Sequence, residues 1–156
     1  MANVSMTVAE LRALGDPTEL DLGHSEGLVV DQARIDAFAD ATLDHQWIHV
    51  DTSRAASGPF GTTIAHGYLT LSLVPRFLED LLEVSDQVRG TNYGIESARF
   101  TDVVPSGSEL VMSGRVTGVT AGPDGGVRYR VAVEMRVVGA SRPCLVAEIV
   151  YLAYDS

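Results

Sequence analysis

The chain contains no lysine and only one cysteine, and these shortages argue against nucleic-acid binding and against a fold held by disulfides. Its 11 basic residues, all arginine, are outnumbered by 21 acidic residues, which gives a formal net charge of −10. Surfaces that bind nucleic acids normally carry an excess of basic residues, so this balance argues against DNA or RNA as a partner. Because the lone Cys144 cannot form an internal disulfide, folding is not expected to depend on oxidation.

Long apolar segments are also missing. No stretch approaches the ~18 consecutive apolar residues of a membrane helix, and the N-terminus lacks the basic and apolar regions of a signal peptide. We therefore expect a cytoplasmic protein with no membrane partner. The 156 residues, 46% of them hydrophobic, show no internal repeat or linker-like tract. This length predicts one domain over residues 1–156, with enough apolar surface to bury a core.

Helical patterns dominate the first half of the chain. A short helix is expected around Val8–Leu14, and a strand near Gly27–Val30 precedes a helix over residues 32–42. Asp31 is a suitable N-cap for the second helix, since its carboxylate can accept from a free backbone N–H. Residues 43–63, interrupted by glycine and proline, are expected to form an irregular but ordered loop.

The segment from His66 to about Leu82 is apolar on nearly all sides of its first half. This pattern predicts a helix buried inside the domain. Pro75 lies within it, and an interior proline removes a backbone hydrogen bond. We therefore expect a kink there or a helix in two pieces.

Beyond Gly90 the apolar residues alternate with polar ones, the period of a half-buried strand. Gly122–Gly126 is a strong turn signal between two such segments. Helices followed by a run of strands predict an α+β fold, with an antiparallel sheet packed on one long hydrophobic helix. The expected strands cover residues 93–101, 109–120, 127–137 and 144–154.

Asp44 and His49 are the first candidates for chemistry. They lie five residues apart in the expected loop, where reactive groups are often displayed. A carboxylate can orient a water molecule, and an imidazole titrates near neutrality and can transfer a proton. Spacing alone leaves a structural alternative open, in which the aspartate caps a helix or turn and the histidine is merely exposed.

A second candidate is the segment Gly61–Gly67, which leads into the buried helix. The first N–H groups of a helix have no internal partner, so the N–H of Gly67 could stabilise a carbonyl oxygen that gains negative charge. Equally, Gly67 could simply permit close packing of helix against sheet. His66 could donate to a ligand, or it could be a buried histidine held by a backbone carbonyl.

Taken together, these segments resemble a known family. Residues 38–72 are similar to the MaoC-like dehydratases, also called R-specific enoyl-CoA hydratases or hydratase 2 enzymes. The family motif Gly-Asp-x-Asn-Pro-aliphatic-His, followed after five residues by a small one, is matched by Asp44, Ile48, His49 and Ala55. The second family signature stands here as Ile64-Ala65-His66-Gly67. Asn92-Tyr93-Gly94 and Arg99-Phe100 also resemble single-domain bacterial members, so that the resemblance covers most of residues 30–105.

Three positions depart from the motif. Leu43 replaces its glycine, Gln46 its asparagine and Trp47 its proline. None of these changes removes a reacting group, although Leu43 is expected to alter the turn before Asp44 or the acyl pocket.

The resemblance implies a hot-dog fold, a sheet wrapped around a central helix, and a homodimer with acyl-CoA bound along the subunit interface. It implies that Asp44 and His49 activate water for (R)-specific hydration of 2-enoyl thioesters or the reverse dehydration. By the same resemblance, the N–H of Gly67 stabilises the thioester oxygen and His66 is a weaker candidate for substrate binding. No cofactor or metal is expected, because His24, His45, His49, His66 and Cys144 show no metal-ligand spacing.

Two other functions fit the same fold. A hot-dog thioesterase would place water at the thioester carbonyl rather than at C3, and the match of Asp44 and His49 to the hydratase motif speaks against it. A non-catalytic acyl-binding subunit of a heteromeric hydratase would be expected to have lost the pair, which this chain retains.

Overall fold

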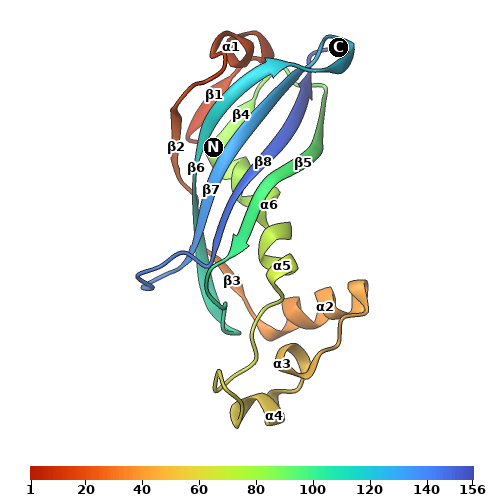
Figure 1. Cartoon of the computed structure of the whole chain (residues 1–156), viewed down its shortest axis with the longest axis vertical. Helices are drawn as coiled ribbons and strands as arrows, with labels where there is room; N and C mark the ends of the chain where they lie inside the picture. The colour runs from red at the N-terminus through yellow and green to blue at the C-terminus, as the bar shows by residue number, and fades with distance from the viewer.

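A curved antiparallel sheet wraps around a hydrophobic helix in the computed structural model, which describes residues 1–156 (Figure 1). The strand order is β2-β6-β7-β8-β5, with β3 also paired to β6, and every pair in this sheet is antiparallel. This arrangement confirms the expected α+β class and the hot-dog fold. The strands are β2 (Leu20–His24), β3 (Leu28–Val30), β5 (Arg89–Phe100), β6 (Ser108–Ala121), β7 (Val127–Val137) and β8 (Leu145–Tyr154).

Alternation of side chains explains why the long strands cover the helix on one face. In β7, Val127 and every second residue up to Met135 are buried, while the residues between them are only partly covered. All four strands expected in the second half of the chain are present, and β7 has the expected bounds. Strand β5 begins at Arg89, earlier than expected, because its first residues pair with the end of β8.

The central helix is divided, as the proline predicted. Helix α5 (Gly67–Ser72) ends at Leu73, and α6 (Val74–Leu81) begins at the next residue. Pro75 lies in the first turn of α6, where its missing N–H costs no helical hydrogen bond. The helix stops at Leu81 because Leu82 has extended backbone angles and starts the short strand β4 (Leu82–Val84).

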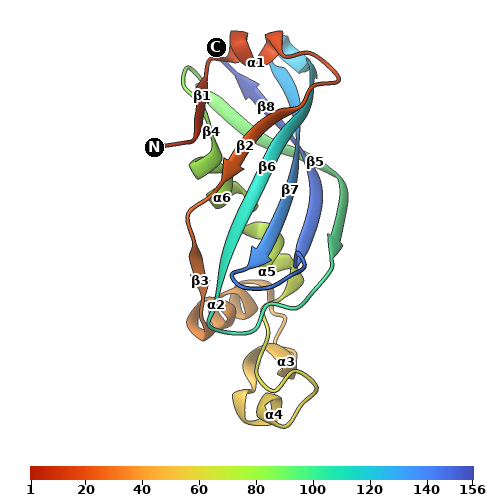
Figure 2. The same cartoon turned by 90° about the vertical axis from the view of Figure 1, so that its left-hand side faces the viewer.

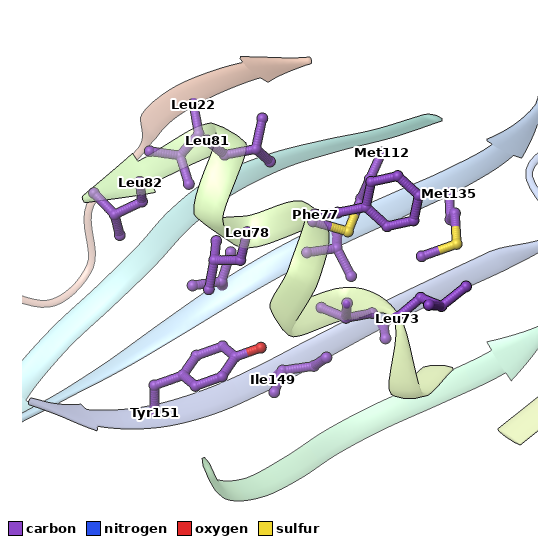
Figure 3. Packing of buried hydrophobic residues seen from close by; sticks show 14 of the residues in the cluster. Leu22, Leu73, Phe77, Leu78, Leu81, Leu82, Met112, Met135, Ile149 and Tyr151 are labelled. Atoms are coloured by element: carbon purple, nitrogen blue, oxygen red, sulfur yellow. The ribbon is translucent and has the colours of Figure 1, made fainter. Parts of the chain in front are cut away.

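The core lies between the central helix and the concave face of the sheet (Figure 3). Phe77 and Leu81 are almost completely buried; Met112 and Met135 from β6 and β7 lie beside Phe77, and Leu22 lies beside Leu81. Burying side chains of this size contributes about 1.5–3 kcal/mol each relative to leaving them exposed. The helix is therefore fixed in the sheet's concave face, and this fixes where its N-terminus lies.

Three helices lie beyond one end of the sheet (Figure 2). Helix α2 (Gln32–Thr42) has the expected bounds, and the carboxylate of its N-cap Asp31 accepts from the backbone N–H of Arg34 at 2.9 Å. The expected irregular loop after it was wrong in part, since α3 (Trp47–Val50) and α4 (Thr52–Ala56) interrupt it. Helices of one turn are too short to show a periodic apolar pattern.

Three elements at the N-terminal side complete the fold. The expected first helix is α1 (Val8–Ala13), capped by Thr7 and Glu10 in a reciprocal pair of hydrogen bonds. Strand β1 (Val4–Met6) pairs in parallel with β4, and together with β2 these two strands were not anticipated from the sequence. None of the helices combines the length and apolar character needed to cross a bilayer.

Candidate active site

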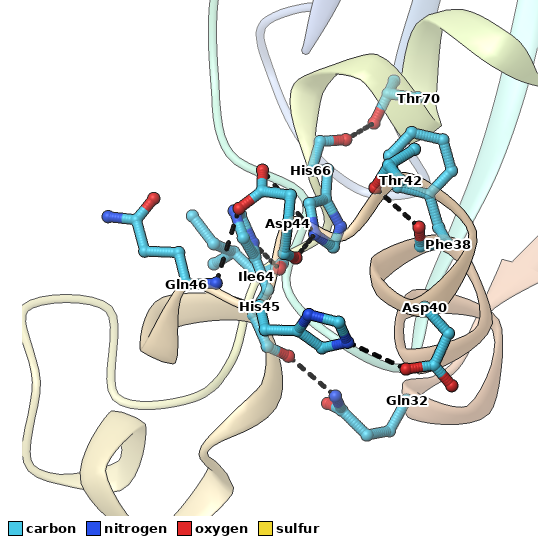
Figure 4. A network of polar contacts seen from close by, with 11 residues as sticks. Gln32, Phe38, Asp40, Thr42, Asp44, His45, Gln46, Ile64, His66 and Thr70 are labelled. Carbon is cyan, nitrogen blue, oxygen red and sulfur yellow. Dashed lines mark hydrogen bonds and ion pairs between the residues drawn. The ribbon is translucent and has the colours of Figure 1, made fainter.

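Asp44 and His49 come together with His66 where α2, α3 and the start of α5 meet. Figure 4 shows Asp44 beside His66 at this point. One nitrogen or carboxylate oxygen from each of the three side chains lies within 4.8 Å of the others. Residues 22 positions apart in sequence thus share one site. The Asp44 side chain is 53% exposed, whereas the two imidazoles are buried, so the site has one open side and one closed side.

Asp44 owes its position to the end of α2. Leu43 terminates this helix in the left-handed conformation, with φ of 62°, and thereby turns the chain toward α3. This conformation explains the glycine of the family motif at this position, because left-handed backbone angles favour glycine. The carboxylate of Asp44 makes only long contacts: it accepts from the backbone N–H of Gln46 at 3.4 Å, and its Oδ2 lies 4.0 Å from Nε2 of His66. It is therefore available to a bound molecule.

His49 is held from both its ring and its backbone. Its Nδ1 lies 2.7 Å from the carbonyl oxygen of Ile64. A carbonyl can only accept, so Nδ1 carries the proton and Nε2 of the neutral ring has a free lone pair. Burial lowers the pKa of His49, and the adjacent His66 lowers it further, against the opposing effects of the Ile64 hydrogen bond and of Asp44. The ring is thus suited to accept a proton near neutral pH.

The backbone of His49 depends on a residue that sequence reasoning did not identify. Gln32, in the first turn of α2, donates from Nε2 to the carbonyl oxygen of His49 at 2.7 Å. Its Oε1 accepts from the hydroxyl of Thr63, a buried side chain, at 2.5 Å. These partners lie 17 and 31 residues away, so no local pattern could have indicated the bridge.

His66 lies beneath both candidates. Its Nε2 donates to the main-chain oxygen of Asp44 at 2.9 Å, and its ring stacks on His49 with centroids 3.8 Å apart. The sequence left open whether His66 donates to a ligand or is a buried histidine held by a backbone carbonyl, and its Nε2 makes the second kind of contact. Its Nδ1 is buried without a partner, and a substrate-binding role stays a prediction.

Gly67 is the first residue of α5, and no side chain caps that end of the helix. A Cβ atom at this position would lie 3.1 Å from the ring of Phe100 on β5, so the glycine permits a close helix–strand contact. Gly67 therefore has the packing role that the sequence analysis considered. Its position at the helix N-terminus is also compatible with its N–H donating to a substrate oxygen.

A pocket of roughly 330 Å³ opens between these elements. His49 lies on one side of it, and β5 and the loop after it form another. A small molecule in the pocket would therefore contact His49 and the start of α5. Its lining includes His49, Gly67, Thr70, Phe100, Val104 and Cys144.

Asp44, His49 and His66 are also the group that could coordinate a metal ion, since imidazole and carboxylate are common ligands of zinc. The sequence had shown no such spacing, because the three residues are brought together only by the fold. As the structure stands, Nδ1 of His49 and Nε2 of His66 are both occupied by carbonyl oxygens, and the remaining donors are Nε2 of His49, the buried Nδ1 of His66 and the carboxylate.

Comparison with known proteins identifies relatives of the chain and of its fold. A 3-hydroxyacyl-thioester dehydratase Z from Mycobacterium tuberculosis is 43% identical over 127 residues, which cover 81% of this chain and 84% of that protein. A monoamine oxidase regulatory protein from Archaeoglobus fulgidus shares the fold with a TM-score of 0.76 at 20% identity, over 100% of this chain and 99% of that chain. An (R)-hydratase from A. caviae involved in PHA biosynthesis superimposes with a TM-score of 0.69 at 21% identity, over 90% and 97% of the two chains.

Residues 15–138, well over half of the chain, match the family described as MaoC like domain. The resemblance inferred from the two sequence signatures is thereby confirmed. On this match and on the 43% identical relative, the chain belongs to the MaoC-like dehydratase family.

Proposed function

We propose that the protein is a hydro-lyase that adds water to trans-2-enoyl-CoA to form (R)-3-hydroxyacyl-CoA, and catalyses the reverse dehydration. The observation that carries this proposal is the Asp44 carboxylate within 4.8 Å of a ring nitrogen of buried His49, whose Nε2 is unprotonated and which lines a pocket that reaches the start of α5. The name of the 43% identical relative, a 3-hydroxyacyl-thioester dehydratase, supports the same reaction.

In the proposed reaction the two side chains act on one water molecule. Asp44 orients the water, and Nε2 of His49 accepts its proton as the oxygen bonds to C3. The electron pair of the C2–C3 double bond moves toward the thioester carbonyl and gives an enolate-like intermediate. A proton is then returned to C2 on the same face, with Asp44 sharing the transfer. Water is added and nothing is oxidised or reduced.

The developing negative charge on the thioester oxygen requires a donor. The N–H of Gly67 is suited to this role because it belongs to the uncapped first turn of α5 and lines the same pocket as His49. Removing one preorganised donor of this kind typically lowers kcat by about 10²–10³-fold. Catalysis in this scheme uses only side-chain and backbone groups, and we propose no metal or other cofactor.

A homodimer is the proposed assembly. Strand β5 is one edge of the sheet, pairs only with β8, and is exposed along most of its length. Tyr93, Ile95 and Phe100 on it are all more than 40% exposed. Exposed apolar edge strands invite pairing with another chain. Phe100 also lines the His49 pocket, so a second copy along β5 would border the site.

CoA thioesters as substrates and a cytoplasmic location are also proposals. The location is supported by the lone Cys144, which is buried and unpaired. The acidic net charge disfavours an acidic carrier protein as the acyl donor.

Incubation with crotonyl-CoA and with a longer 2-enoyl-CoA, followed by enoyl absorbance and chiral analysis of the product, tests the reaction. Formation of the (R)-3-hydroxyacyl-CoA supports it. Release of free CoA without hydration would identify a thioesterase instead. A rate that is unchanged after dialysis against EDTA is expected for metal-free chemistry, and a loss that zinc restores would contradict that part of the proposal.

A further inference from the structure

The buried imidazole of His66 touches both proposed catalytic residues, and the proposed chemistry gives it no task. It donates to the main chain of Asp44 and stacks on the ring of His49, with an interplanar angle of 24°. Phe38 from α2 packs against it, with ring centroids 4.9 Å apart. One side chain at the start of the central helix therefore links the loop that carries the Asp44 carboxylate to the ring that accepts the proton. Figure 4 shows His66 beside Asp44.

We propose that His66 is a positioning residue that holds Asp44 and His49 at their working separation and opposes premature protonation of His49. The inference rests on the proposed roles of Asp44 and His49 in water addition. It assigns His66 two separable tasks, one carried by its N–H donor and the other by the positive charge that its stacked imidazole can carry.

The first task follows from how loosely Asp44 is otherwise held. Its side chain is more than half exposed, and its other hydrogen bond is the 3.4 Å contact with the N–H of Gln46. The 2.9 Å bond from Nε2 of His66 to the Asp44 carbonyl oxygen is shorter and joins the loop to the buried helix. Without this bond the carboxylate would sample positions away from His49, and small misplacements of a reacting group lower rates strongly.

The second task follows from the stacking of two imidazoles. Positive charges at 3.8 Å repel each other strongly in a partly buried site. Burial is the largest cause that lowers the pKa of His49, and His66 adds to it, while Asp44 acts in the opposite direction. Asp102 also lines the pocket beside His49. Burial and the neighbouring His66 together therefore favour the unprotonated base in the presence of these carboxylates.

Two variants separate the tasks. His66→Phe keeps a buried stacked ring but removes the donor and the charge, whereas His66→Gln keeps an amide N–H at a similar reach and removes the ring. We expect His66→Phe to lower kcat by about 10–100-fold with KM changed by less than about threefold, because positioning acts on the chemical step. His66→Gln should recover much of the lost kcat. In both variants the acid limb of kcat/KM should move to higher pH, since His49 becomes easier to protonate.

NMR titration of the His49 imidazole in the wild type and both variants measures the effect of His66 on His49 protonation directly, without substrate turnover. A higher pKa of His49 in His66→Phe supports the inference, and the exposed His24→Gln is the matched control that should change neither titration nor rate. Melting temperatures identify a variant that fails to fold. If one of the two His66 variants does not fold, the kinetics and titration of the other test the inference.

Wild-type kcat and an unshifted His49 titration in a folded His66→Phe would overturn the inference. So would a His66→Gln variant no more active than His66→Phe with its His49 titration unshifted. Absence of hydration by the wild type, together with the expected NMR shift, would instead contradict the proposed function and leave the coupling of the two imidazoles supported.

Discussion

At the scale of single residues, Leu43 shows where the chain departs from its family at an energetic cost. Its φ of 62° is unfavourable for a residue with a Cβ, by about 1–2 kcal/mol. The side chain is 80% exposed, so replacing it removes little burial. Leu43→Gly should therefore raise the free energy of unfolding by about 0.5–1 kcal/mol, the gain being reduced by the greater freedom of glycine in the unfolded chain. Urea unfolding measures this change, and a destabilised variant would show that Leu43 makes contacts the exposed side chain does not reveal.

His49 makes a pH-dependent contribution whose sign follows from its burial. Because the pKa of His49 is lowered in the folded protein, the unfolded chain takes up a proton on this residue at higher pH than the folded one. The contribution is constant above about pH 6.5, the ordinary pKa of histidine, and stability is lost as the pH falls from there toward the folded-state pKa. His49→Gln should make the decline below that pH shallower in urea titrations at several pH values. An equally steep decline in the variant would assign it to other groups.

At the scale of elements, the sequence predicted the parts with strong periodic or capping signals. Asp31 and the apolar spacing after it located α2, Pro75 predicted the division of the central helix, and alternation in Val127–Val137 located β7. Strands of three residues such as β1 and β4 have too few positions to show a period. The site residues were predicted from two family signatures, whereas the Gln32 bridge depends on contacts between distant segments that no local pattern encodes.

The contact of α5 with β5 makes a prediction at the same scale. Gly67→Ala would place a methyl group 3.1 Å from the ring of Phe100, so the ring or the helix start must shift by a few tenths of an ångström, and we expect the helix start to move. Overpacking of this kind costs about 1–3 kcal/mol, and the shift should also lower the hydration rate by moving the proposed N–H donor. Combining Gly67→Ala with Phe100→Leu should recover most of the stability. Thermal unfolding and kcat of the single and double variants measure both effects, and a Gly67→Ala protein as stable and active as the wild type would contradict them.

At the scale of the whole molecule, the exposed edge of the sheet predicts how the protein assembles. Ile95 lies in the middle of β5 and is 51% exposed in the single chain. Ile95→Lys would place a charge in the proposed interface and should convert a dimer into a monomer, with loss of hydration if the second copy completes the site. Sedimentation velocity distinguishes the two states, and Arg115→Lys on β6 is a control that should remain dimeric. A wild type that sediments as a monomer with full activity would contradict the proposed assembly.

The most direct test of the account is the hydration rate of Asp44→Asn and His49→Gln, each compared with the wild type. Both variants keep side chains of similar size, so their circular dichroism spectra should be unchanged. Because each removes one acid–base group, the rate of 2-enoyl-CoA hydration should fall by roughly 10²–10⁴-fold. Losses of that size in folded proteins would establish the pair as the groups that activate water, and full activity in either folded variant would contradict that central claim.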